Sequence, residues 1–121
     1  AYSLSYAQQK SQGSETEQMV HKARAIMEEH VFNNLEMETI SRKIGISYNH
    51  FRAMFKEYTG QAPYQYYLNI KINKAKELLE SEYFTVKEVA FELGFENPYY
   101  FSRLFKKKTG VIPSCWHEAC L

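Results

Sequence analysis

The side chains best suited to binding chemistry lie between Asn97 and Gly110, near the C-terminal end of the 121-residue chain. This stretch carries four positive charges, from one arginine and three consecutive lysines, and no acidic residue. Helical spacing places four of its polar side chains on one face: Tyr99, Ser102, Arg103 and Lys106. Arginine can donate two hydrogen bonds to a guanine edge and lysine attracts phosphate, so this face suits the major groove of DNA.

The element that must position these side chains is predicted to be a helix with well-defined ends. Asn97 can accept a hydrogen bond from a free backbone N–H at its start, and Pro98 suits the first helical position. Phe101 and Phe105 fall on the opposite face, so we expect them in the hydrophobic core. Gly110 is expected to end the helix.

The sequence contains no motif typical of a catalytic site or a metal site. The four histidines are scattered without metal-ligand spacing, no nucleophile is paired with a base, and no glycine-rich phosphate loop occurs. Cys115 and Cys120 lack the spacing of a zinc site or a disulfide framework, so we expect free thiols. We therefore expect no enzyme activity, no cofactor and no metal.

Composition and termini predict a cytoplasmic protein. The net charge of +1 does not by itself indicate nucleic acid, so the basic stretch is a local feature. No run is apolar enough to span a bilayer, and the first ten residues do not resemble a signal peptide. Free thiols agree with a reducing compartment. Because the chain does not begin with methionine, we expect it to be a piece of a longer protein.

The rest of the chain predicts helices and no strand. Residues 1–14 are polar and are expected to form a flexible lead-in, after which Ser14 and Glu17 match a capping box that begins the first helix. Apolar stripes predict further helices at about 35–44, 47–58, 63–80 and 85–93, and a short helix follows Pro113. In the helix at 47–58, the residues expected to face inward are Phe51, Met54, Phe55 and Tyr58.

The second half of the chain repeats the first. At an offset of 49 residues, the matched pairs are Leu35 and Phe84, Ile40 and Val89, Ile44 and Leu93, and Gly45 and Gly94. At an offset of 50, the segment from Phe51 to Pro63 matches that from Phe101 to Pro113, including F-K-x-x-T-G-x-x-P. A small residue, Ser41 or Ala90, stands four positions before each turn glycine. This pattern is typical of a helix-turn-helix unit, present here twice.

These motifs resemble the DNA-binding domain of AraC/XylS-type transcription regulators over about residues 17–117. The resemblance rests on the G-x-S…F-K-x-x-T-G run, on K-I-N-K-A-K-E-L-L and on G-F-x-N-P-Y-Y-F-S-R-L-F-K-K-x-T-G. It implies an all-α fold of about seven helices, in which a long linker helix joins two helix-turn-helix subdomains. We expect the first subdomain at 15–66, the linker helix at 64–80 and the second subdomain at 81–121.

The resemblance also implies that the third and sixth helices enter successive major grooves of double-stranded DNA. Carried over by position, and with the neighbouring lysines included, the predicted DNA-binding residues are Asn49, Arg52, Ala53, Lys56, Tyr99, Ser102, Arg103, Lys106 and Lys107. Arg103 can contact either a guanine or a phosphate, and Ala53 can at most touch a thymine methyl group. The lysines are either phosphate contacts or solvated charges.

The sequence departs from the family at three places. Lys71 stands in the linker helix where arginine is usual, and Ser41 stands where alanine is usual. Trp116 and His117 replace the usual tyrosine and arginine after the last proline. Because lysine lacks the two-pronged donor of arginine, we expect any pairing that Lys71 makes between the subdomains to be weaker.

The resulting hypothesis is a bacterial transcription regulator, expected to be an activator, whose DNA-binding output domain is this chain. The resemblance implies a sensor or dimerisation domain outside the chain, RNA polymerase as a further partner, and no membrane partner. A rival hypothesis is a helical protein–protein interaction module, which the near-neutral charge allows. A third is a stand-alone DNA binder with two sites and no sensor.

Overall fold

The computed structural model describes the backbone of residues 2–119 and the side chains of residues 15–117. This part of the chain is helical and contains no strand, so the predicted all-α class is confirmed. Its α-helices and one 3₁₀ helix are α1 (Tyr2–Glu29), α2 (Met37–Ile44), α3 (Tyr48–Thr59), α4 (Pro63–Glu80), α5 (Val86–Glu92), α6 (Pro98–Thr109), η1 (Pro113–Cys115) and α7 (Trp116–Ala119).

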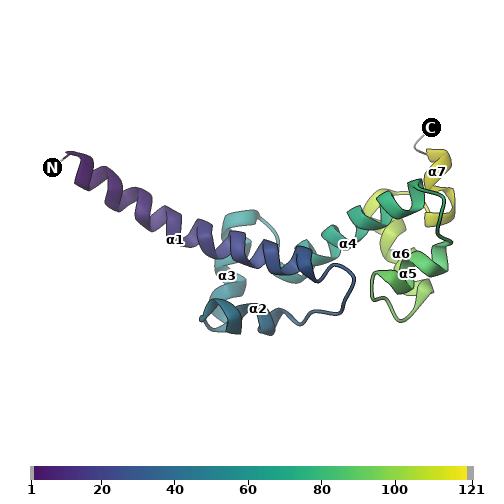
Figure 1. Ribbon diagram of the computed structural model, residues 1–121, viewed down its shortest axis with the longest axis horizontal. Coiled ribbons are helices and arrows are strands. Elements are labelled where there is room, and N and C mark those ends of the chain that lie inside the picture. Colours follow the sequence, from purple (N-terminus) through teal and green to yellow (C-terminus); the bar gives the residue numbers. More distant parts are fainter. Residues whose placement is uncertain (1, 120–121) are drawn as a thin grey trace.

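The helices form two groups along an elongated molecule (Figure 1). The first group contains α1, α2 and α3, and the second contains α5, α6 and α7. α4 runs from one group to the other and contacts helices of both. The orientation of α3 relative to α6 therefore depends on how each group is fixed to α4.

α1 differs from the sequence prediction, because it begins at Tyr2 rather than after Ser14. The backbone of residues 2–14 is helical, so the expectation that the first helix begins at Ser14 is wrong. The physical reason is helix propagation. Once the turns around the buried Val20 and Met27 form, each further residue costs little, and no proline precedes them to stop the helix.

The predicted starts of three other helices are confirmed by their caps. The side chain of Ser47 accepts a hydrogen bond from the His50 N–H at 3.1 Å. Thr85 and Glu88 form a complete capping box at the start of α5. Asn97 accepts from the Tyr99 N–H at 2.8 Å at the start of α6. These bonds satisfy backbone donors that a helix start leaves free.

Two hydrophobic clusters make up the core. The first contains Val20, Ala23, Met27, Met37, Ile40, Phe51, Phe55 and Tyr67. The second contains Val31, Leu68, Ile72, Ala75, Leu79, Val89, Ala90, Leu93, Phe95, Phe101 and Phe105. α4 supplies buried side chains to both clusters, so it is part of both hydrophobic cores as well as the connection between the two helix groups. Tyr58 was predicted to face inward, but its side chain is 46% exposed. It lies in the last turn of α3 and lines a pocket between α3 and α1.

Candidate nucleic-acid interface

α3 presents a polar face to solvent and an aromatic face to the core. The four side chains predicted to contact DNA are exposed: Asn49, Arg52, Ala53 and Lys56. On the other face, Phe51 and Phe55 are fully buried, with ring centroids 5.6 Å apart. The buried phenylalanine pair fixes the rotation of α3 about its axis, and that rotation determines which side chains point outward.

α6 has the same arrangement. Tyr99 is 81% exposed, and Arg103, Lys106 and Lys107 are exposed as predicted, whereas Ser102 is half-buried. Phe101 and Phe105 are fully buried, with centroids 5.9 Å apart, and Trp116 of α7 packs edge-on against Phe105. The structure thus places the predicted residues of each helix on one outward face. Their contacts with DNA stay a prediction.

The two helices also end in the same way. The Thr59 hydroxyl donates to the Phe55 carbonyl at 2.8 Å and accepts from the Gln61 N–H at 3.2 Å. Fifty residues later, Thr109 makes equivalent bonds, of equal length, to the Phe105 carbonyl and the Val111 N–H. The sequence repeat is therefore a repeat of local structure.

Lys71 joins the two helix groups at the middle of α4. Its side chain is only 2% exposed, and its Nζ donates to the Val31 carbonyl at 2.8 Å and to the Asn33 carbonyl at 2.6 Å. It also donates to the Leu93 carbonyl, which follows α5. One ammonium group therefore ties the segment after α1 to the segment after α5, and burial lowers its pKa to about 8.

The backbone approaches closely at this junction. Gly94 has a φ of +82°, and a Cβ at this position would stand 3.1 Å from the carbonyl carbon and oxygen of Asn33. The Tyr67 hydroxyl lies 2.6 Å from the same Asn33 oxygen and can donate to it. Burial raises the pKa of Tyr67 to about 12, so this hydroxyl keeps its proton. Gly94 is thus required both for the turn and for the contact between the two groups.

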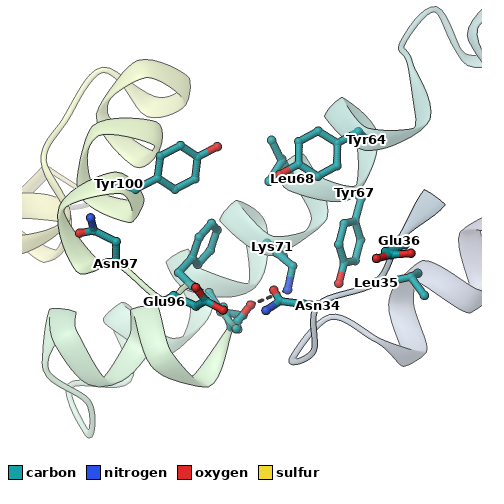
Figure 2. Close-up of a pocket in the computed structure, with 13 residues that line it drawn as sticks. Asn34, Leu35, Glu36, Tyr64, Tyr67, Leu68, Lys71, Glu96, Asn97 and Tyr100 are labelled. Atoms are coloured by element: carbon teal, nitrogen blue, oxygen red, sulfur yellow. Dashed lines mark hydrogen bonds between the residues drawn. The ribbon is translucent and has the colours of Figure 1, made fainter. Parts of the chain in front are cut away.

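A pocket of about 450 Å³ opens beside the junction (Figure 2). Tyr64 of α4 and Tyr100 of α6 point toward one another across it, and Lys71 lies deeper, next to Asn34. Glu36 and Glu96 give its rim acidic character. Because the Lys71 ammonium is already bonded to three carbonyls, it has no donor left for a ligand in this pocket.

Sequence reasoning missed the junction in two respects. It expected Lys71 to make a weak pairing, but the partners are backbone carbonyls, which require donors and not a two-pronged fork. It assigned Gly94 only to a turn, whereas Gly94 also packs against Asn33. The repeat could not reveal this contact, because a Cβ at Gly45, the counterpart of Gly94, would have no atom within 4 Å.

The residues that the structure describes hold neither a cluster of metal-ligating side chains nor a membrane-spanning helix. No group of three or more histidine, cysteine or acidic residues could hold a metal there. Among those residues, no helix is both long and apolar enough to cross a membrane. Cys115 is a half-buried free thiol, and Cys120 lies outside the described residues.

Comparison with known proteins assigns the family. A family model described as a helix-turn-helix domain matches residues 40–119. A transcriptional regulator from Chromobacterium violaceum with an AraC-type DNA-binding domain shares the fold, with a TM-score of 0.80 at 24% identity over 84% of this chain and 91% of that one. The chain belongs to the AraC-type helix-turn-helix family. AraC-type domains are DNA-binding domains of transcription regulators and are not an enzyme family.

Two further AraC-type relatives share more sequence with the chain. The MmsAB operon regulatory protein of Pseudomonas aeruginosa is 38% identical over 94 residues, which are 78% of this chain and 31% of that protein. The DNA-binding domain of AdpA, solved in complex with a target DNA, is 28% identical, with a TM-score of 0.77 over 83% of this chain and 90% of that one. The chain thus spans less than a third of the length of the MmsAB regulator.

Proposed function

We propose that this chain binds double-stranded DNA with α3 and α6 in successive major grooves, about 34 Å apart. The observation that carries the proposal is the pair of outward polar faces on α3 and α6, each backed by a buried phenylalanine pair. The bonded junction at Lys71 supports it, because two helices can bind one duplex together only if their relative orientation is fixed. The DNA complex of the similar AdpA domain supports it as well.

Each predicted contact has a role that follows from its side chain. Arg103 donates to a guanine edge, Asn49 and Arg52 contact base edges, and Ala53 touches a thymine methyl group. The lysines bind phosphates without base preference. Tyr99 and Ser102 lie on the same outward side of α6 and add hydrogen bonds to sugar or phosphate.

The whole protein is a larger transcription regulator in the cytoplasm, of which this chain is the output domain. The greater length of the MmsAB regulator supports a further sensor or dimerisation domain outside the chain. RNA polymerase is the partner through which a DNA-bound output domain would act on transcription. An activator rather than a repressor is our proposal for this protein.

Selection of bound oligonucleotides followed by mobility-shift titration tests the proposal. We expect one preferred duplex sequence and an affinity that falls steeply with salt. Arg103→Ala should relax the preference at one base pair by about 1–3 kcal/mol. Arg42→Ala removes the same charge from an exposed position on α2, outside the predicted contacts, and should leave base preferences unchanged. Selection of no preferred sequence would favour the rival protein-interaction module.

A further inference from the structure

The internal repeat has produced two equivalent grooves with different linings. One groove, of about 400 Å³, lies between α4 and α6; we call it the α4–α6 groove, and its lining is Tyr64, Gln65, Leu68, Tyr100, Arg103, Leu104, Lys107 and Lys108. The other, of about 460 Å³, lies between α1 and α3; we call it the α1–α3 groove, and its lining is Thr16, His50, Ala53, Met54, Glu57 and Tyr58. The α3 and α6 residues of these linings correspond one to one at the offset of 50.

The two grooves differ in charge. The lining of the α4–α6 groove holds three cationic side chains, Arg103, Lys107 and Lys108, and no acidic one. At the corresponding positions the α1–α3 groove has Ala53, Glu57 and Tyr58, so its lining holds an acid and no lysine or arginine. Since the α3 and α6 residues of the two linings stand at corresponding positions of the repeat, the difference in charge lies in their side chains.

The cations of the α4–α6 groove have no anionic partner among the residues that the structure describes. Arg103, Lys107 and Lys108 form no ion pair with any residue in the described part of the chain. Burial lowers the pKa of Lys108, and the charge of Lys107 lowers it further, so the crowded ammonium groups destabilise each other's charged form. An anion in the groove would relieve this repulsion.

Neutral donors complete the groove on the α4 side. Tyr64 is 48% exposed and Gln65 is exposed, and both stand in the first turn of α4 opposite the cations of α6. Burial raises the pKa of Tyr64, and the neighbouring Tyr100 raises it further, so the hydroxyl remains a donor at neutral pH. Hydroxyl and amide groups are common donors to phosphate oxygens in protein–DNA complexes.

We propose that the α4–α6 groove binds a phosphodiester of the DNA backbone through Tyr64, Gln65, Lys107 and Lys108, and that the α1–α3 groove does not. The proposal rests on the proposed DNA binding and adds three contact residues to it: Tyr64 and Gln65 on α4, and Lys108 on α6. It also makes the grip on DNA asymmetric: the second helix-turn-helix unit supplies more of the salt-dependent affinity than the first. The positive charge of the α4–α6 groove suits an anion. We choose a DNA phosphate over an acidic protein surface because the groove is continuous with the exposed face of α6, which is the proposed DNA-binding face.

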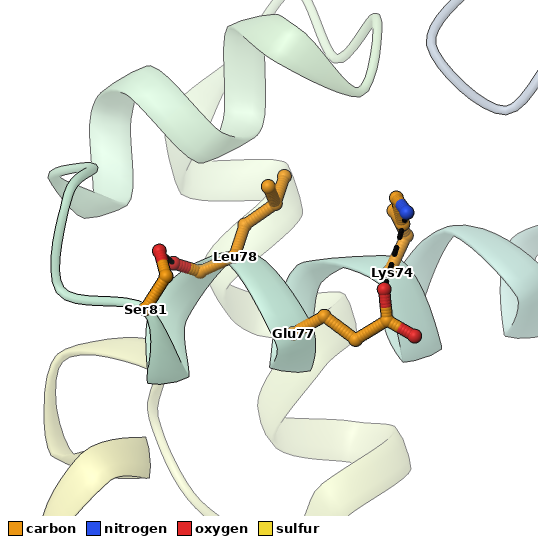
Figure 3. A network of polar contacts seen from close by, with 4 residues as sticks. All are labelled: Lys74, Glu77, Leu78 and Ser81. Atoms are coloured by element: carbon orange, nitrogen blue, oxygen red, sulfur yellow. Dashed lines mark hydrogen bonds and ion pairs between the residues drawn. The ribbon is translucent and has the colours of Figure 1, made fainter.

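The test places an acid in the groove and compares it with the same change elsewhere on α4. Gln65→Glu should weaken binding roughly tenfold for the selected duplex and for an unrelated duplex alike, because a phosphate contact carries no sequence information. Asn73→Glu is the control: Asn73 is exposed on α4 and lines a different pocket, near the ion pair of Lys74 and Glu77 at 3.1 Å (Figure 3). Circular dichroism checks that both variants are folded.

A second pair of variants tests the asymmetry through the salt dependence of affinity. Lys108→Gln should lower the slope of log affinity against log salt by about 1, as expected for one lost phosphate contact. Glu57→Lys places the counterpart of Lys107 in the α1–α3 groove and should raise the slope and tighten binding. Glu57→Gln, which removes the acid without adding a cation, should change the slope by less than Glu57→Lys.

The outcomes separate this proposal from the proposed function. If Gln65→Glu binds as Asn73→Glu does, or if Lys108→Gln leaves the salt slope unchanged, the phosphate groove is refuted even though Arg103→Ala relaxes base preference. If Glu57→Gln already raises the slope as far as Glu57→Lys does, the asymmetry is refuted. Failure of the unaltered chain to select any duplex would refute the proposed function itself.

Discussion

Lys71→Met is the substitution that tests the junction most sharply. Methionine keeps an unbranched side chain of similar length but removes all three donors from a position that is 2% exposed. The carbonyls of Val31 and Leu93 then lose their donor, while the Asn33 carbonyl keeps the Tyr67 hydroxyl at 2.6 Å. The substitution therefore leaves two buried acceptors unsatisfied and releases the tie between the helix groups.

The expected magnitude follows from those two carbonyls. An unsatisfied buried backbone group costs about 1–3 kcal/mol, so two cost roughly 2–6 kcal/mol. Part of this is offset because the buried ammonium no longer has to be desolvated. We expect a net decrease in the free energy of unfolding of about 2–3 kcal/mol, with the chain still folded.

Urea denaturation followed by circular dichroism measures this change, and mobility shift measures its effect on DNA binding. Lys71→Arg is the matched control, because arginine keeps the charge and has enough donors for all three carbonyls; it should cost less than about 1 kcal/mol. Lys71→Met should weaken binding to a duplex with two half-sites more than binding to a single half-site. A free energy of unfolding within about 0.5 kcal/mol of the unaltered chain would refute the reasoning.

Three further predictions concern local structure and pH. Gly94→Ala should destabilise the chain more than Gly45→Ala in thermal melts: both have φ near +85°, but only at Gly94 would the Cβ meet backbone, at 3.1 Å. Thr85→Ala should cost about 1 kcal/mol in urea denaturation, because it removes one half of the capping box of α5. Burial lowers the pKa of Lys71 to about 8 from its ordinary value of 10.5, so between these values the unfolded chain binds more protons. The stability difference between the unaltered chain and Lys71→Met should therefore grow as pH rises from 8 to 10.5, and a constant difference in urea midpoints across that range would contradict it.

Much of the fold could be predicted from local signals. The caps at Ser47, Thr85 and Asn97 fix helix starts through bonds between residues two or three positions apart, and such bonds are visible in sequence. The phenylalanine pairs on α3 and α6 fix the outward faces through helical periodicity. The exposed positions of Asn49, Arg52, Ala53 and Lys56 follow from the same periodicity.

The features that sequence could not predict are those that depend on distant segments. Lys71 bonds to residues 22 to 40 positions away, and its acceptors are carbonyls, which every residue has. The tight contact of Gly94 with Asn33 likewise joins segments that are far apart in sequence. The predicted start of α1 is wrong because the polar composition of residues 1–14 suggested a lead-in. No proline stands among these residues to stop a helix.

The central claim is that α3 and α6 act as one rigid pair on a single duplex. Its most direct test is the affinity for the selected duplex after about 5 base pairs, half a helical turn, are inserted between the two half-sites. We predict that the insertion lowers the affinity to that of a duplex with one half-site, because α4 and the Lys71 junction do not let α6 follow the rotated groove. An affinity unchanged by the insertion would contradict the account.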